Sequence, residues 1–196
     1  MFHSWLSHNY IEVIGSIAGL VYIYFSIKQL IWLWPLGILT SILYFFIFFE
    51  AKFYADMALQ LYYLYISVYG WNYWTKNKTN NEEKVPVKTS SLKEWIVFVS
   101  LTIILSVIIG AGLDKFTDSP LPYWDAFTTS GSIIATWMLA KKYLEQWLFW
   151  IIIDFVSMGT YIYKNLYPTS ILFGIYTVMA GIGYINWRKD LKNNKK

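Results

Sequence analysis

The sequence contains no cysteine and few charged residues. Without cysteine the chain can form no disulfide, no thiolate nucleophile and no cysteine-based zinc site. Its two histidines, His3 and His8, both lie near the N-terminus and indicate no metal site. No P-loop, GxSxG or HExxH pattern is visible, so nothing suggests an ATPase or one of these hydrolase classes. We therefore expect neither a cofactor nor an enzymatic activity.

Charged residues make up only 14% of the 196 positions, whereas a soluble domain carries roughly a quarter. By contrast 57% are hydrophobic and 21% aromatic, and the mean hydropathy is +0.40. This balance predicts an integral membrane protein. The net charge of +4 does not indicate a nucleic-acid partner, because the lysines are concentrated in short loops and in the tail. The aromatic content exceeds what interfacial belts require, so we expect some rings to line a path for a ring-bearing solute.

A transmembrane helix needs about 20 mostly apolar residues. Seven segments of this kind predict an all-α integral membrane protein: Ile11–Ile27, Leu30–Phe49, Tyr54–Trp74, Trp95–Gly112, Tyr123–Ala140, Tyr143–Tyr163 and Tyr167–Trp187. The fourth segment is aliphatic and β-branched, which favours a lipid-facing connector. The polar stretch before it reads as a linker, and the basic tail RKDLKNNKK as disordered.

An internal repeat organises the chain. A shift of 113 residues superposes the first three segments on the last three, so that Trp34 meets Trp147, Gly70 meets Gly183 and Trp74 meets Trp187. Three helices, one connector and three helices make a 3+1+3 arrangement of parallel repeats, with a substrate site expected between them. The predicted divisions are the first repeat (1–75), the linker (76–94), the connector helix (95–112), the second repeat (121–188) and the tail (189–196).

Lysine and arginine counts predict the orientation. The side that carries the N-terminus holds 3 of these residues and the other side holds 13. Cytoplasmic loops carry the excess of positive charge. We therefore expect the N-terminus outside and the C-terminus in the cytoplasm.

The stretch KKYLEQWLFWIIID (141–154) predicts the binding site. Gln146, Trp150 and Asp154 are four residues apart, so they share one helical face, which continues to Ser157. Polar side chains at membrane depth are costly to bury, which makes a binding site the default interpretation. The candidate contacts on the other segments are Ser41, the face Asp56, Gln60, Tyr63 and Ser67, and Tyr176.

Four tryptophans near segment ends, Trp34, Trp74, Trp147 and Trp187, are interpreted mainly as interfacial anchors. Trp147 is kept as a further candidate contact because it adjoins the polar face. For Trp150, one turn deeper, ligand contact is the favoured interpretation.

The chain resembles the Pnu-type bacterial vitamin transporters, the family that includes the nicotinamide riboside transporters called PnuC. The resemblance is carried by YIEVIGSIAGL (10–20), QLYYLYISVYGWNYW (60–74), YWD (123–125) and KKYLEQWLFWIIID (141–154). It implies a full-length SWEET-like fold of two three-helix bundles, usually a homotrimer in the bacterial cytoplasmic membrane. It further implies facilitated diffusion with trapping of the vitamin by phosphorylation, and ligand contacts at Gln60, Gln146 and Trp150.

The sequence departs from the riboside carriers of that family at two positions. Gln146 stands where asparagine is usual, and Asp154 where another asparagine often stands. A carboxylate suits a ligand with a cationic ring, either nicotinamide riboside or thiamine. If neither binds, riboflavin is the next candidate. A SWEET-like sugar carrier is the alternative of another class, and it would hardly need Asp154.

Overall fold

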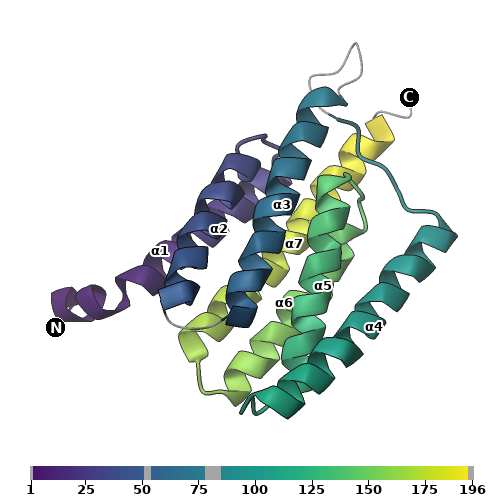
Figure 1. Cartoon of the computed structure of the whole chain (residues 1–196). Coiled ribbons are helices and arrows are strands. Elements are labelled where there is room, and N and C mark those ends of the chain that lie inside the picture. The colour runs from purple at the N-terminus through teal and green to yellow at the C-terminus, as the bar shows by residue number, and fades with distance from the viewer. Residues whose placement is uncertain (1, 51–53, 78–84, 194–196) are drawn as a thin grey trace.

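The computed structural model describes the backbone of residues 2–50, 54–77 and 85–193, and side chains within these ranges from residue 15 onward, except at 48 and 54–56. Within this part of the chain there are seven α-helices and no β-strand, as the sequence predicts (Figure 1). The helices are α1 (Phe2–Ile27), α2 (Leu33–Glu50), α3 (Tyr54–Lys76), α4 (Leu92–Phe116), α5 (Pro122–Ala140), α6 (Gln146–Tyr163) and α7 (Tyr167–Asn193).

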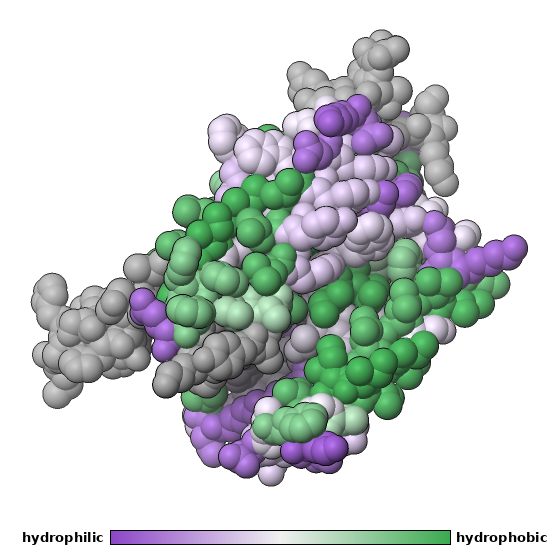
Figure 2. Space-filling model, in the orientation of Figure 1, coloured by the Kyte–Doolittle hydropathy of each residue, from purple (hydrophilic) through white to green (hydrophobic). Residues whose placement is uncertain are grey.

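The surface has the distribution of polarity that a bilayer requires. Figure 2 shows hydrophobic residues across the middle of the molecule and hydrophilic residues gathered at its two ends. Two helices, α4 and α7, are long and apolar enough to cross a membrane on length and composition alone. Large aliphatic side chains of α4 are exposed, among them Ile96, Val97, Ile103, Ile104, Val107 and Ile108. Exposed aliphatic surface of this extent favours contact with lipid.

Six of the helices form a closed ring. Each helix contacts the next in the order α1, α2, α3, α5, α6, α7, and α7 in turn contacts α1. Helix α4 packs on α5 and lies outside this ring (Figure 1). The contacts of α3 with α5 and of α7 with α1 therefore join the first three helices to the last three.

The turns after α1 and α5 have the same hydrogen bonds at positions 113 residues apart. In the first turn Gln29 N–H donates to the Ser26 carbonyl and Leu30 N–H to the Phe25 carbonyl. In the second, Lys142 N–H donates to the Leu139 carbonyl and Tyr143 N–H to the Met138 carbonyl. Both turns place a left-handed residue after the helix, with φ of 55° at Gln29 and 64° at Lys142.

This is the Schellman arrangement, which usually has glycine at the left-handed position. Here glutamine and lysine occupy it, so no glycine marks the turn in the sequence. The predicted starts of the next two helices are therefore about three residues too early. Helix α2 begins at Leu33 rather than Leu30, and α6 at Gln146 rather than Tyr143.

Residues 85–91, predicted as part of the linker, pack against the end of the helical ring. Lys88 N–H donates to the Lys142 carbonyl and Leu144 N–H donates to the Lys88 carbonyl. Val85 and Val87 are 5% exposed. We call residues 85–91 the strap. The remaining linker residues up to 84 include positions 78–84, which lie outside the described residues.

The strap is joined to α4 by Glu94, which lies in the first turn of that helix. The Tyr143 hydroxyl donates to Glu94, and so do the backbone and side chain of Ser91. Glu94 therefore accepts hydrogen bonds both from Ser91 of the strap and from Tyr143 in the turn before α6.

The prediction that the basic tail is disordered is wrong for residues 188–193. Helix α7 continues to Asn193, and the Gln29 amide donates to the Asp190 carboxylate at 2.6 Å. A contact across the molecule therefore holds the end of the helix in place.

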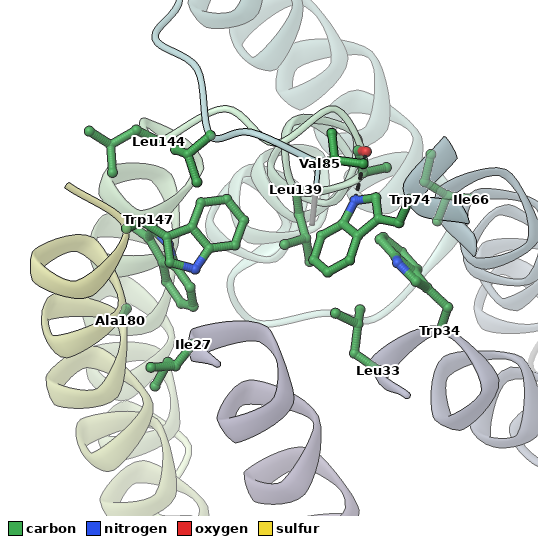
Figure 3. Packing of buried hydrophobic residues seen from close by; sticks show 13 residues of the cluster. Ile27, Leu33, Trp34, Ile66, Trp74, Val85, Leu139, Leu144, Trp147 and Ala180 are labelled. Atoms are coloured by element: carbon green, nitrogen blue, oxygen red, sulfur yellow. Dashed lines mark hydrogen bonds between the residues drawn. The ribbon is translucent and has the colours of Figure 1, made fainter. Parts of the chain in front are cut away.

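The four tryptophans interpreted as interfacial anchors are buried inside the protein. Trp34, Trp147 and Trp187 are 0–1% exposed and Trp74 is 3% exposed. They pack edge to face in two pairs, Trp34 with Trp74 at 5.3 Å and Trp147 with Trp187 at 5.6 Å between ring centroids. Figure 3 shows Trp34, Trp74 and Trp147 around a common centre, with Val85 of the strap beside them. The interfacial interpretation is therefore wrong, since protein surrounds these rings.

Candidate functional site

Two adjoining cavities lie within the helical ring. The first has a volume of about 290 Å³, which is near the lower limit for pockets that bind small molecules. It is lined by residues of α1, α2, α3, α5 and α6. The second, of about 160 Å³, is lined by residues of α1, α5, α6 and α7. Gly19, Tyr22 and Trp150 line both cavities and mark their boundary.

Trp150 and Asp154 are the two predicted residues of α6 that reach the cavities on the expected face. They are one helical turn apart, so both side chains point to the same side of α6. Asp154 lines the second cavity and is 4% exposed. The indole at the boundary offers a flat apolar surface, and the carboxylate offers a negative charge beside it. A ring that bears positive charge is complementary to both groups.

Polar side chains of the first three helices surround the larger cavity. Gln60, Tyr63 and Ser67 of α3 line it, as the predicted polar face of that helix requires, and Ser41 of α2 lines it as well. Ser132 of α5 is hydrogen-bonded to the Tyr63 side chain. Asp56, also predicted on this face, lies outside the residues whose side chains are described. The amide and hydroxyl groups can hydrogen-bond a ligand that has several polar groups.

The remaining predicted residues take different positions. Trp147 and Tyr176 line the second cavity. Gln146 is fully buried, lines neither of these two cavities, and has no hydrogen-bond partner for either side-chain atom among the described residues. Ser157 is 5% exposed and also lies outside both linings. Of the eleven candidate residues, the structure therefore brings eight to the two cavities; Gln146 and Ser157 lie outside them, and the side chain of Asp56 is outside the described part.

Helix α1 forms a wall of the larger cavity that was not predicted from the sequence. Gly15, Ala18 and Gly19 line the larger cavity. The Tyr44 hydroxyl lies against Gly15 and the Tyr176 hydroxyl against Gly19, so closely that a Cβ atom at either glycine would collide with it. Small residues four apart let another helix or a large side chain approach closely. The spacing of Gly15 and Gly19 in GSIAG was the sequence signal for this wall.

A ring of helices with an apolar outer surface and internal cavities lined by aromatic and polar side chains defines a helical membrane protein. Residues 9–189 match the family model described as nicotinamide mononucleotide transporter. The chain belongs to this family of multi-pass bacterial membrane transporters.

Its curated relatives include several vitamin transporters. The chain is 28% identical to the nicotinamide riboside transporter PnuC of Escherichia coli strain K12, over 91% of this chain and 85% of the relative. It is 25% identical to the PnuC of Neisseria mucosa, over 97% and 74%. It is 20% identical to the riboflavin/roseoflavin transporter RibM of Streptomyces davaonensis, over 90% and 83%.

A solved structure has the same fold. The crystal structure of the vitamin B3 transporter PnuC superposes with a TM-score of 0.77 and 22% identity, over 97% of this chain and 85% of that one. The seven-helix architecture predicted from the sequence thus matches the fold of a solved transporter structure.

Proposed function

We propose that this protein imports nicotinamide riboside across the bacterial cytoplasmic membrane. The observation that carries this proposal is the position of Trp150 between the two cavities, with Asp154 in the second. The pyridinium ring of the riboside is flat, aromatic and positively charged. Stacking on a desolvated indole contributes up to about 2 kcal/mol to the binding of such a ring.

The other candidate contacts fit the rest of the ligand. Gln60 can pair with the carboxamide, while the hydroxyls of Ser41 and Tyr63 suit the ribose. Tyr176 and Trp147 would close the second cavity around the ring. Gln146 and Ser157 would reach the ligand in another conformational state.

A riboside fits the lining better than the phosphorylated mononucleotide does. Among the described residues that line the two cavities there is no lysine or arginine, and Asp154 adds a negative charge. A phosphate would therefore lack a cationic partner. This difference also supports transport by facilitated diffusion, because phosphorylation inside the cell would produce a molecule that the same cavity disfavours.

The proposed architecture is a SWEET-like pair of parallel three-helix repeats, α1–α3 and α5–α7, with α4 as connector. The identical hydrogen bonds of the turns at Gln29 and Lys142 support it, as do the equivalent tryptophan pairs. Rocking of one repeat against the other would expose the cavity to each side in turn. We further propose a homotrimer within the lipid bilayer, as the family resemblance implies.

Thiamine is the second candidate ligand, and Asp154 is the observation that favours it. Thiamine has a cationic thiazolium ring, and the amine of its pyrimidine can donate to a carboxylate. A sugar carrier would need aromatic surfaces and amides but no carboxylate at this position.

Isothermal titration of the purified protein with nicotinamide riboside, thiamine and riboflavin tests these proposals. We expect saturable binding of the riboside, and Trp150→Ala should weaken it by about 30-fold, the equivalent of about 2 kcal/mol. Trp124→Ala is the matched control, because Trp124 is 52% exposed and lines neither cavity. Binding of thiamine alone would reassign the ligand. Unchanged affinity in Trp150→Ala would remove Trp150 from the site.

A further inference from the structure

A buried lysine lies at the end of the helical ring where the turns after α1 and α5 meet. Lys142 is 1% exposed, and Gln29, at the equivalent position of the other turn, is 6% exposed. The Lys142 ammonium donates to Gln29 Oε1, and Gln29 Nε2 donates to Asp190 Oδ2 at 2.6 Å. The glutamine amide thus connects the cation to a carboxylate.

Two indole rings surround this ammonium. Lys142 Nζ lies 3.9 Å from the ring centroid of Trp74 and 5.2 Å from that of Trp187. Both rings are fixed by hydrogen bonds, from Trp74 Nε1 to the Ala140 carbonyl and from Trp187 Nε1 to the Ser26 carbonyl, each 3.1 Å long. Fixed indole faces around a cation resemble the aromatic sites that bind quaternary ammonium ligands. We call Trp74 and Trp187 the cage.

The cage adjoins the second cavity. Trp147 lines that cavity and packs edge to face against Trp187, and Ser26, which accepts from Trp187, lines the same cavity. Val85 and Val87 of the strap are buried in the same cluster as both cage rings. The cage therefore adjoins both the lining of the cavity and the strap, and Figure 3 shows Val85 of the strap beside Trp74.

We infer that the cage is a second binding site for an organic cation on the transport path, and that Lys142 fills it in this state as a tethered cation. When the ammonium leaves, a cationic ligand from the central cavity takes its place between the same two rings. Two cations cannot share the cage, because their repulsion in a desolvated site is strong. Lys142 therefore keeps this end of the cavity closed until the exchange occurs. The inference rests on the proposed transport of a cationic ligand.

The absence of native cysteine allows a direct test by labelling. Ser26→Cys places one thiol in the second cavity beside the cage. This variant is prepared in membrane vesicles whose outer face exposes the Lys142 end. The vesicles are treated with a cationic trimethylammonium methanethiosulfonate and, separately, with an anionic sulfonate reagent of similar size. Adding Lys142→Met should raise the rate of labelling by the cationic reagent about tenfold or more relative to the rate for the anionic reagent. An aromatic site without its ammonium, and with Asp190 nearby, attracts cations.

Two matched variants control the result. Lys141→Met removes the neighbouring lysine, which lies over Tyr69 and Tyr73 outside the cage, and should leave both rates unchanged. Lys142→Arg retains a cation in the cage and should keep the cationic reagent slow. Thermal unfolding of each variant confirms that it is folded.

Equal acceleration of both reagents would overturn the cation site, because it would mean only that the end had opened. No acceleration in a folded Lys142→Met variant would overturn the closing role of Lys142. Titration of the unlabelled wild-type protein with nicotinamide riboside tests the proposed function separately, since labelling of the introduced thiol does not require the riboside to bind.

Discussion

At the scale of single residues, the charge of Asp154 separates the candidate ligands most sharply. The carboxylate is 4% exposed in the second cavity, and no hydrogen bond to it is found among the described side chains. An ionised carboxylate in such surroundings needs a partner. A cationic ring provides one, whereas a neutral sugar does not.

Asp154→Asn should therefore weaken binding of oxidised nicotinamide riboside by about tenfold to a hundredfold, the usual contribution of a charged hydrogen-bonding partner. The reduced riboside has nearly the same shape but no positive charge, so its affinity should change little. Titration of both ligands against both proteins gives the comparison. Equal losses for the two ligands would mean that Asp154 supports the fold of the site rather than the charge of the ligand. An unchanged affinity for the oxidised form would mean that Asp154 does not contribute to recognition of the cationic ring.

Much of the site follows from helical spacing, and the remainder does not. The spacing on α3 and α6 predicts that Gln60, Tyr63, Trp150 and Asp154 face the interior, and all four line a cavity. Gln146 has the same spacing, yet its amide is enclosed by protein. Spacing gives the direction of a side chain but not the depth at which the cavity ends. Whether Gln146 contacts a ligand in another state stays a prediction.

At the scale of helices, two glycines determine how closely the tryptophans pack. A Cβ atom at Gly70 would collide with the ring of Trp34, and one at Gly183 with the ring of Trp147. The pairs are 113 residues apart and the collisions are with ring carbons in both. Neither indole can move easily, because Trp34 and Trp147 are 0% and 1% exposed.

Gly183→Ala should destabilise the protein by about 1–3 kcal/mol, the usual cost of overpacking a core. Gly181→Ala is the matched control on the same helix, since a Cβ atom there meets nothing within 4 Å. That change should be neutral or stabilising by up to about 1 kcal/mol, because alanine has the higher helix propensity. Thermal unfolding in detergent measures both. A Gly183→Ala variant as stable as Gly181→Ala would mean that the Trp147 ring can shift at little cost.

The sequence predicts the existence of the helices better than their ends and their surroundings. Hydropathy locates all seven helices, because long apolar runs leave few alternatives. The starts of α2 and α6 are missed because a glutamine and a lysine adopt the left-handed position in the turns before them. The burial of the four tryptophans is missed because hydropathy does not distinguish a ring that faces lipid headgroups from a ring that packs against another helix.

At the scale of the whole molecule, the two ends differ strongly in charge. The predicted topology assigns 13 of the 16 lysines and arginines to the side that carries the strap, the Lys142 turn and the C-terminus, and 3 to the opposite side. Figure 1 shows the start of α1 and the end of α7 at opposite ends of the molecule, as an odd number of crossings requires. The same charged end contains the cage, so the side on which it lies decides whether Lys142 closes the entrance or the exit.

Single-cysteine labelling in intact cells assigns the two ends. The positive-inside rule predicts that the end with 13 basic residues is cytoplasmic. Asp118→Cys, in the exposed turn between α4 and α5, should then react with an impermeant maleimide added outside. Thr89→Cys, exposed on the strap, should react only after the cells are permeabilised. The opposite pattern would place the C-terminus outside, and the cage would then guard the entrance. With the predicted pattern, a cation leaving the central cavity for the cytoplasm meets the cage last, so exchange with Lys142 becomes the final step of import.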